Sequence, residues 1–287
     1  MHRTLRAVGV APVAWMGMAS FAVSTGRSST VRSPGGVLTA WLGAWLQNRT
    51  TADDLLAVVG NSDLPPAVDG LPDEPDGAPL VRLLAAVRAC GPSTVELRLP
   101  VAGDADGLGP DVLPTALEAG EAVVVTPADV TRPGLVLVPR PDVRGSEIEP
   151  VIGVRWLAVV PARRVADGPA APTRLREAEI LLDGALTEAI AVLLASGQVD
   201  QLSPEALEAI QELRRRRATD LRLPTGSPPD AVRVLVTAER LGAVVRLAAG
   251  GRPLSSAGDA RRAEALREVA TAIRWTRRLA YTACAAG

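Results

Sequence analysis

The sequence predicts an α+β protein, with a small antiparallel sheet that has helices on one face, followed by an all-α antiparallel helical bundle. Two patterns predict this. Between residues 94 and 160, apolar side chains alternate with polar ones over short stretches, as in half-buried strands. From Thr173 onward they recur at the helical period instead. With 287 residues, 47% of them hydrophobic, the chain is long enough for two domains.

Residues 1–35 are expected to be a leader, either disordered or a mis-assigned start. Residues 1–6 are basic and residues 7–23 carry no charge, which is roughly the pattern of a secretory signal. Pro12 and Gly17 interrupt the apolar run, so an over-extended start is preferred. We therefore expect a cytoplasmic protein, and an exported one if residues 1–24 are a signal peptide. No later stretch approaches the ~20 apolar residues of a membrane span.

The predicted first domain covers residues 36–165. A first amphipathic helix follows Pro34, a second begins after Thr51, which can cap it, and a third spans residues 80–90. A connection rich in Pro, Gly and Asp separates the last two. Strands are expected at 94–101, 121–126, 135–139 and 152–160, with a short helix at 111–119. Because the last three strands follow one another without helices, an antiparallel meander is favoured.

The predicted second domain covers residues 173–287 and contains four helices. They are expected at 175–195, from Ser203 to the arginines near 217, from Ser227 to about 249, and at 259–283. Serine followed by proline is a common helix start, and it occurs at the second and third of them. Four amphipathic helices joined by short loops favour an antiparallel bundle.

Composition excludes several classes of enzyme. All 31 basic residues are arginine and the only histidine is His2, so lysine chemistry is absent and histidine-dependent catalysis would need the second residue. Cys90 and Cys284 are far apart and match no metal spacing. We therefore expect no catalytic residues and no cofactor, and we lean towards a protein that is not an enzyme.

Asp104 and Asp106 lie in the Gly/Asp-rich segment 103–109, which follows a predicted strand. Carboxylate oxygens suit a divalent cation, so these two residues are the weak candidate for a metal site. The spacing does not fit a calcium-binding helix–loop–helix motif, because Leu108 and Thr115 occupy ligand positions. An Asp/Gly turn is the preferred interpretation.

Two arginine clusters on the helical domain could contact nucleic acid or an acidic partner. One is the run Arg214, Arg215, Arg216 and Arg217, and the other comprises Arg274, Arg277 and Arg278, on a helix whose arginines are expected to point mostly outward. A solvated helix end next to glutamates is the preferred interpretation of the run. No aromatic residues alternate with these arginines, so base stacking is not indicated.

Trp41 and Trp45 lie one helical turn apart in a chain with only 2% aromatic residues. Exposed, the pair would mark a partner-binding site. Buried, it would anchor the first helix in the core, which is the preferred interpretation.

Four features together resemble a family of uncharacterised proteins of high-GC Gram-positive bacteria. They are the Trp41–Trp45 helix, the Pro/Asp/Gly connection, the strand VELRLPVAGD at 95–104 and the segment EAGEAVVV at 118–125. The helical half is similar to the same group, so the resemblance covers about residues 36–287. It implies no known activity and no catalytic residues.

The function expected from these observations is that of a non-enzymatic binding or adaptor protein. Its partner would be another protein or a second copy of the chain. Two alternatives remain open at this point, namely nucleic-acid binding through the arginines and a carboxylate- or metal-dependent enzyme at the 103–111 loop.

Overall fold

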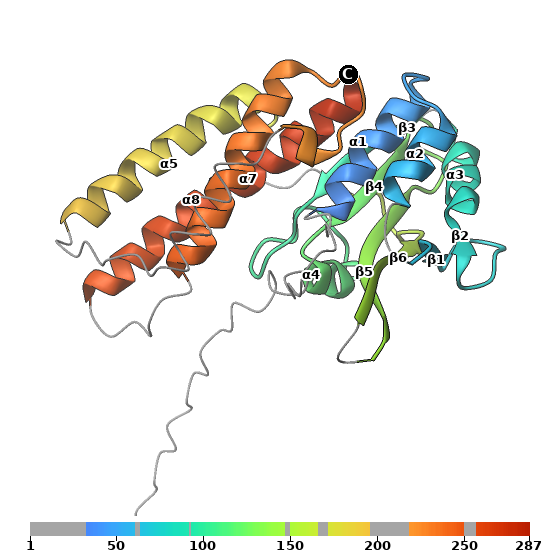
Figure 1. Ribbon diagram of the computed structural model, residues 1–287, viewed down its shortest axis with the longest axis horizontal. Helices are drawn as coiled ribbons and strands as arrows, with labels where there is room; N and C mark the ends of the chain where they lie inside the picture. Colours follow the sequence, from blue (N-terminus) through green and yellow to red (C-terminus); the bar gives the residue numbers. More distant parts are fainter. Residues whose placement is uncertain are drawn as a thin grey trace, which may run out of the picture.

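The structure is a computed structural model that describes residues 33–60, 64–91, 93–146, 150–165, 172–195, 218–249 and 257–287. In these ranges a six-stranded sheet packs with helices, and a group of long helices lies beside it (Figure 1). The α+β class is thereby confirmed. Residues 1–32 of the predicted leader and the helix predicted after Ser203 lie outside the described residues. The predicted end of the leader at residue 35 was wrong, because Ser33 caps α1 and the helix begins at Pro34.

The first three helices cover one face of the sheet. They are α1 (Pro34–Leu46), α2 (Ala52–Val59) and α3 (Leu80–Ala89). The Ser33 and Thr51 hydroxyls cap α1 and α2 by accepting the Gly36 and Asp54 main-chain N–H groups. Leu38, Leu55 and Leu83 from these helices are fully buried in the largest core cluster.

The strands are β1 (Ala67–Asp69), β2 (Ala78–Pro79), β3 (Ser93–Arg98), β4 (Ala122–Pro127), β5 (Leu135–Gly145) and β6 (Pro150–Val159). They lie in the order β2-β1-β6-β5-β4-β3. The predicted meander of the last three strands, β4 to β6, is antiparallel, and β3 also pairs with β4 in the antiparallel sense. The sheet as a whole is mixed, because β1 pairs with β6 in parallel.

Two parts of the predicted sheet were wrong. Strands β1 and β2 fall inside the Pro/Gly/Asp connection, and they are too short to show alternation. Helices also lie on both faces, because the opposite face packs Val124, Val136 and Val138 against Leu108 and Ala116, the latter in α4 (Leu113–Ala119). Buried on both sides, β4 reads as a nearly continuous apolar run rather than an alternating one.

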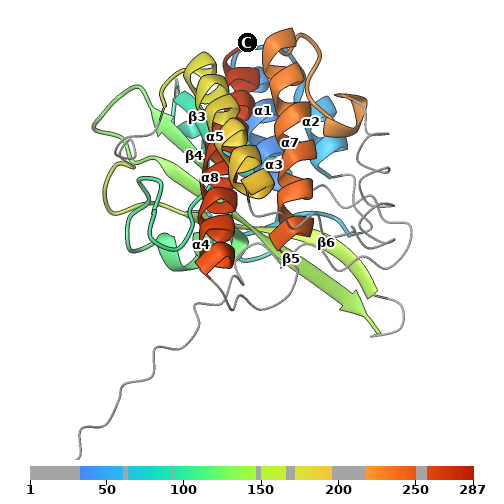
Figure 2. The ribbon, with the colours of Figure 1, turned by 90° about the vertical axis from the view of Figure 1, so that its left-hand side faces the viewer.

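The helical part contains α5 (Leu175–Ala195), α7 (Pro229–Ala249) and α8 (Ala257–Ala286). A short 3₁₀ turn at Ala218–Leu221 lies between α5 and α7. Leu182, Ala238 and Val269, one from each helix, share a core cluster. Helices α5 and α7 both pack against α8, and the three long helices run close together in Figure 2.

Helix α8 does not belong to the bundle alone, because its C-terminal half packs against α1 and β3. Tyr281 and Cys284 share a buried cluster with Ala40 and Leu97. The approach to α1 is close, since a Cβ placed on Gly43 would lie 2.4 Å from the Ala285 Cβ. An isolated all-helical bundle is therefore not what forms, and α8 is shared between both parts.

Candidate functional site

The 103–109 loop is bound to α8 by buried charged groups. Arg278 donates to the Asp106 carboxylate at 2.7 Å, and the Leu99 main-chain N–H donates to its other oxygen at 2.8 Å. Arg274 donates to the Asp104 carboxylate and to the Leu99 carbonyl. The two aspartates thus hold the C-terminal helix against the end of β3.

The main chain and the partners of this loop match the Asp/Gly turn that is the preferred interpretation. Gly103, Asp106 and Gly107 adopt positive φ angles, as expected for an Asp/Gly turn. Although partial burial opposes it, hydrogen bonds from the Asp106 N–H and from Arg274 lower the pKa of Asp104. Arginines already neutralise both carboxylates and would repel a cation. Within the described ranges, no three His, Cys, Asp or Glu side chains gather as a metal site requires.

The structure places Arg274, Arg277 and Arg278 inside the molecule, against the expectation that most arginines of this helix point outward. Their side chains are 11%, 14% and 10% exposed. Arg277 donates to Glu239 of α7 at 2.7 Å. They face inward because the C-terminal half of α8 packs on the sheet. Arg274 and Arg278 there meet the aspartates of the 103–109 loop, and Arg277 meets Glu239 of α7. Arg214 to Arg217 lie outside the described residues.

Glu121, just before β4, forms a second buried polar contact. Its carboxylate accepts the Ser33 hydroxyl at 2.6 Å and the Gly35 N–H at 3.0 Å, at the start of α1. Burial raises its pKa, while Ser33, Gly35 and nearby Arg277 oppose that shift. Burial similarly raises the pKa of Tyr281. These groups join α1, β4, α7 and α8, and they are not open to solvent.

Trp41 and Trp45 are both buried in the largest core cluster, as the preferred interpretation expects. The Trp41 indole N–H donates to the Arg222 carbonyl at 2.6 Å, which fixes the loop before α7. The Arg88 guanidinium lies over the Trp45 ring, 4.6 Å from its centroid. Both tryptophans thus contribute to the packing of α1.

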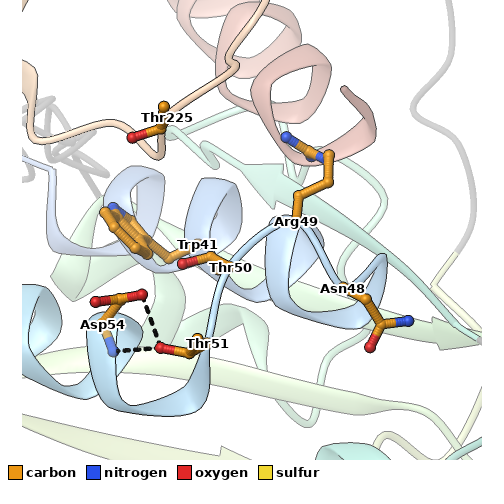
Figure 3. Close-up of a pocket in the computed structure, with 7 residues that line it drawn as sticks. All are labelled: Trp41, Asn48, Arg49, Thr50, Thr51, Asp54 and Thr225. Carbon is orange, nitrogen blue, oxygen red and sulfur yellow. Dashed lines mark hydrogen bonds between the residues drawn. The ribbon is translucent and has the colours of Figure 1, made fainter.

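A pocket of about 410 Å³ opens between the α1–α2 loop and the loop before α7 (Figure 3). Its residues are Trp41, Asn48, Arg49, Thr50, Thr51, Asp54 and Thr225. Several polar groups that line the pocket already form hydrogen bonds within the protein. Thr51 donates to Asp54 at 2.7 Å, and Arg49 donates to the Cys284 and Ala285 carbonyls at the end of α8. Acidic residues in the first turn of α2 also disfavour an anion there.

A projecting hairpin is the other exposed feature, formed by residues 140–145 of β5 and 150–155 of β6. Both views show it extending beyond the helices (Figures 1 and 2). One face of the hairpin is apolar and continues the core outward. Its cross-strand pairs are Pro139 with Trp156, Pro141 with Val154, and Val143 with Ile152. Val143 is 60% exposed. The strand predicted at 135–139 therefore continues to Gly145 in the structure.

The opposite face of the projecting hairpin is charged. Asp142 pairs with Arg144 at 2.9 Å and with Arg155 at 3.7 Å, and Arg155 pairs with Asp69 of β1 at 2.8 Å. Ile180, Leu181 and Ile190 of α5 are also exposed. That helix leads into residues 196–217, which lie outside the described residues.

Together these features define a protein with a mixed sheet, a shared C-terminal helix and a protruding hairpin, rather than one with a recognisable catalytic centre in its described part. The chain belongs to the Rv1486c-like protein family. Residues 36–173 match the N-terminal domain of that family and residues 176–278 match its C-terminal domain. The resemblance seen in the sequence is confirmed.

Two relatives come from Mycobacterium tuberculosis. They are the "Uncharacterized protein MT1533" of strain CDC 1551 / Oshkosh and the "Uncharacterized protein Rv1486c" of strain ATCC 25618 / H37Rv. Each is 30% identical over 284 residues, covering 86% of this chain and 95% of the relative. No solved structure matches the chain. Among the described helices, none is long and apolar enough to cross a membrane.

Proposed function

We propose that this protein is a binding or adaptor protein that acts through contacts with other protein chains. The observation that carries the proposal is the projecting hairpin, whose apolar face continues the core into solvent at Val143 and Ile152. An apolar row on a protruding element exposes surface that the fold itself does not use.

Main-chain groups add to the apolar row. Strand β4 pairs with β5 only from Leu135 to Leu137, so among the described strands none pairs with residues 140–145 on that side. An open strand edge can accept an additional strand through main-chain hydrogen bonds, and alternate side chains then provide specificity.

The two alternative functions receive less support. Arg274, Arg277 and Arg278 are paired with carboxylates of the same chain and offer little charge to a nucleic-acid backbone. Asp104 and Asp106 are engaged by arginine in the same way. Protein contact at the hairpin is therefore the function we favour.

Association measurements with matched variants test this proposal. Val143→Asp introduces a charge on the apolar face of the hairpin, whereas Val130→Asp alters a residue that is 76% exposed elsewhere. We expect Val143→Asp to abolish complexes that the wild-type chain forms, with itself or with a protein of its host, and Val130→Asp to retain them. A wild-type chain that stays monomeric and captures nothing that Val143→Asp loses would contradict the proposal.

A further inference from the structure

The open edge of β5 has a pattern of residues that is complementary to itself. Asp142 and Arg144 flank Val143, one on each side, with opposite charges. Pro141 and Gly145 flank them in turn, and neither carries a charge. Any antiparallel pairing of this strand with an identical strand, centred on Val143, places residue 142 of one copy opposite residue 144 of the other.

That register satisfies both faces of the strand. Directly opposite residues in an antiparallel pair share a face. Asp142 of each copy would meet Arg144 of the other on the charged face, giving two ion pairs. Val143 would meet its own counterpart on the apolar face, next to Ile152 of each hairpin, so that four aliphatic side chains form one row.

The main chain is compatible with this pairing. Proline has no N–H to donate to a neighbouring strand, so Pro141 is best accommodated with its main chain facing the open edge. Groups in an antiparallel ladder alternate sides, which places the N–H and C=O of Val143 at the same edge. The other strand of the hairpin, β6, already has a neighbour in Leu64. A Cβ placed on Gly153 of β6 would lie 2.7 Å from the Leu64 Cβ.

We propose that two copies of this chain associate through the β5 edges of their projecting hairpins, antiparallel and centred on Val143. The proposal rests on the proposed function and identifies its partner as a second copy. Such a contact is isologous, because residue 142 contacts residue 144 and residue 144 contacts residue 142 across a two-fold axis. A contact of this size is small, so the dimer forms weakly and in a concentration-dependent way.

Cross-linking through an introduced cysteine tests the two-fold centre. Cβ atoms of directly opposite residues lie about 4.5–5.5 Å apart, which a short thiol-reactive cross-linker bridges. In a Cys90→Ser background, Val143→Cys is expected to form covalent dimers with such a cross-linker, and Val130→Cys at equal concentration is not. Native Cys284 contributes little, because it is buried and burial raises the pKa of its thiol to about 11. Equal cross-linking of both variants would overturn the proposal.

A charge exchange tests the register independently of folding. Arg144→Glu alone places acids opposite acids, and Asp142→Arg alone places bases opposite bases, so each variant is expected to sediment as a monomer. An equimolar mixture restores both ion pairs and is expected to dimerise, which also shows that both hairpins are folded. A monomeric mixture overturns the proposal. If wild-type complexes persist without Val143 cross-links, the partner is a different protein, and the proposed function stands while this inference fails.

Discussion

Arg278 in α8 donates a hydrogen bond to Asp106 at 2.7 Å, although the two residues are 172 positions apart in the sequence. The contact is buried, and Arg98 of β3 lies 3.7 Å from the same carboxylate oxygen. It connects the loop after β3 to the C-terminal helix, so residues from both family domains complete one buried polar cluster.

Removal of this arginine should destabilise the fold strongly. Arg278→Ala leaves the Asp106 carboxylate buried with only the more distant Arg98 to balance it. Breaking one side of a buried ion pair costs about 3 kcal/mol or more. Denaturant unfolding measures the loss. Arg267→Ala is the matched control, because Arg267 is half exposed beside Glu264 and exposed pairs contribute about 0–1 kcal/mol. Equal losses for the two variants would show that the buried pair contributes no more to the free energy of unfolding than an exposed pair does.

Gly43 should be intolerant of even a methyl group. Gly43→Ala would place a Cβ 2.4 Å from the Ala285 Cβ and 2.6 Å from its Cα, so α1 and α8 would have to separate. We expect a loss of about 1–3 kcal/mol from overpacking, despite the better helix propensity of alanine.

Gly184 in α5 provides the opposite case within the same chain. A Cβ at Gly184 meets nothing within 4 Å, so Gly184→Ala should gain up to about 1 kcal/mol. Thermal unfolding of both variants makes the comparison. A stabilised Gly43→Ala protein would refute the close packing of α1 on α8.

Glu121 should make stability depend on pH in an unusual direction. Burial raises its pKa, and the nearby Glu239 of α7 adds to the rise, against the lowering effect of Ser33, Gly35 and Arg277. The folded state therefore holds the Glu121 proton more tightly than the unfolded state does. Wild-type stability should fall relative to Glu121→Gln as the pH rises above the ordinary value of 4.5 towards the raised pKa. The difference between the two unfolding free energies, measured from pH 4 upward, would be flat if the carboxyl were ionised normally.

The pH dependence of stability that comes from Asp104 should have the opposite sign to that from Glu121. Partial burial works against ionisation, but the Asp106 N–H and Arg274 together lower the pKa of Asp104 below 3.8. Its contribution is therefore present above pH 3.8 and is lost as the pH falls through the lowered value. Asp104→Asn should lose stability relative to the wild type at neutral pH, and the gap should close in acid. A gap that persists at low pH would assign the effect to packing rather than charge.

Local sequence patterns predicted most of the secondary structure. Thr51 caps α2 as expected, α5 has the predicted limits, and the antiparallel order of β4, β5 and β6 follows from their connections without intervening helices. These features depend on contacts within a few residues, which periodicity reports directly.

Long-range contacts could not be predicted in the same way. Nothing near Asp106 indicates that Arg278 will reach it, and nothing near Trp41 indicates that its N–H will meet the Arg222 carbonyl. The arginines of α8 looked like a solvent-facing cluster because periodicity cannot show that a helix extends past its own bundle. The strand predicted at 135–139 did not include the projecting hairpin, where Pro141 is tolerated because an open edge needs no N–H from it.

Hydrogen exchange of the hairpin measures the central claim most directly. Main-chain N–H groups of Val143 and Gly145, which the proposed pairing places at the open edge, should exchange more slowly as the concentration of the chain rises, while those of α2 should not change. Val143→Asp should remove the concentration dependence. Exchange that is identical at all concentrations for the wild-type chain, and unchanged when a captured host protein is added, would contradict the assignment of the hairpin as the contact surface.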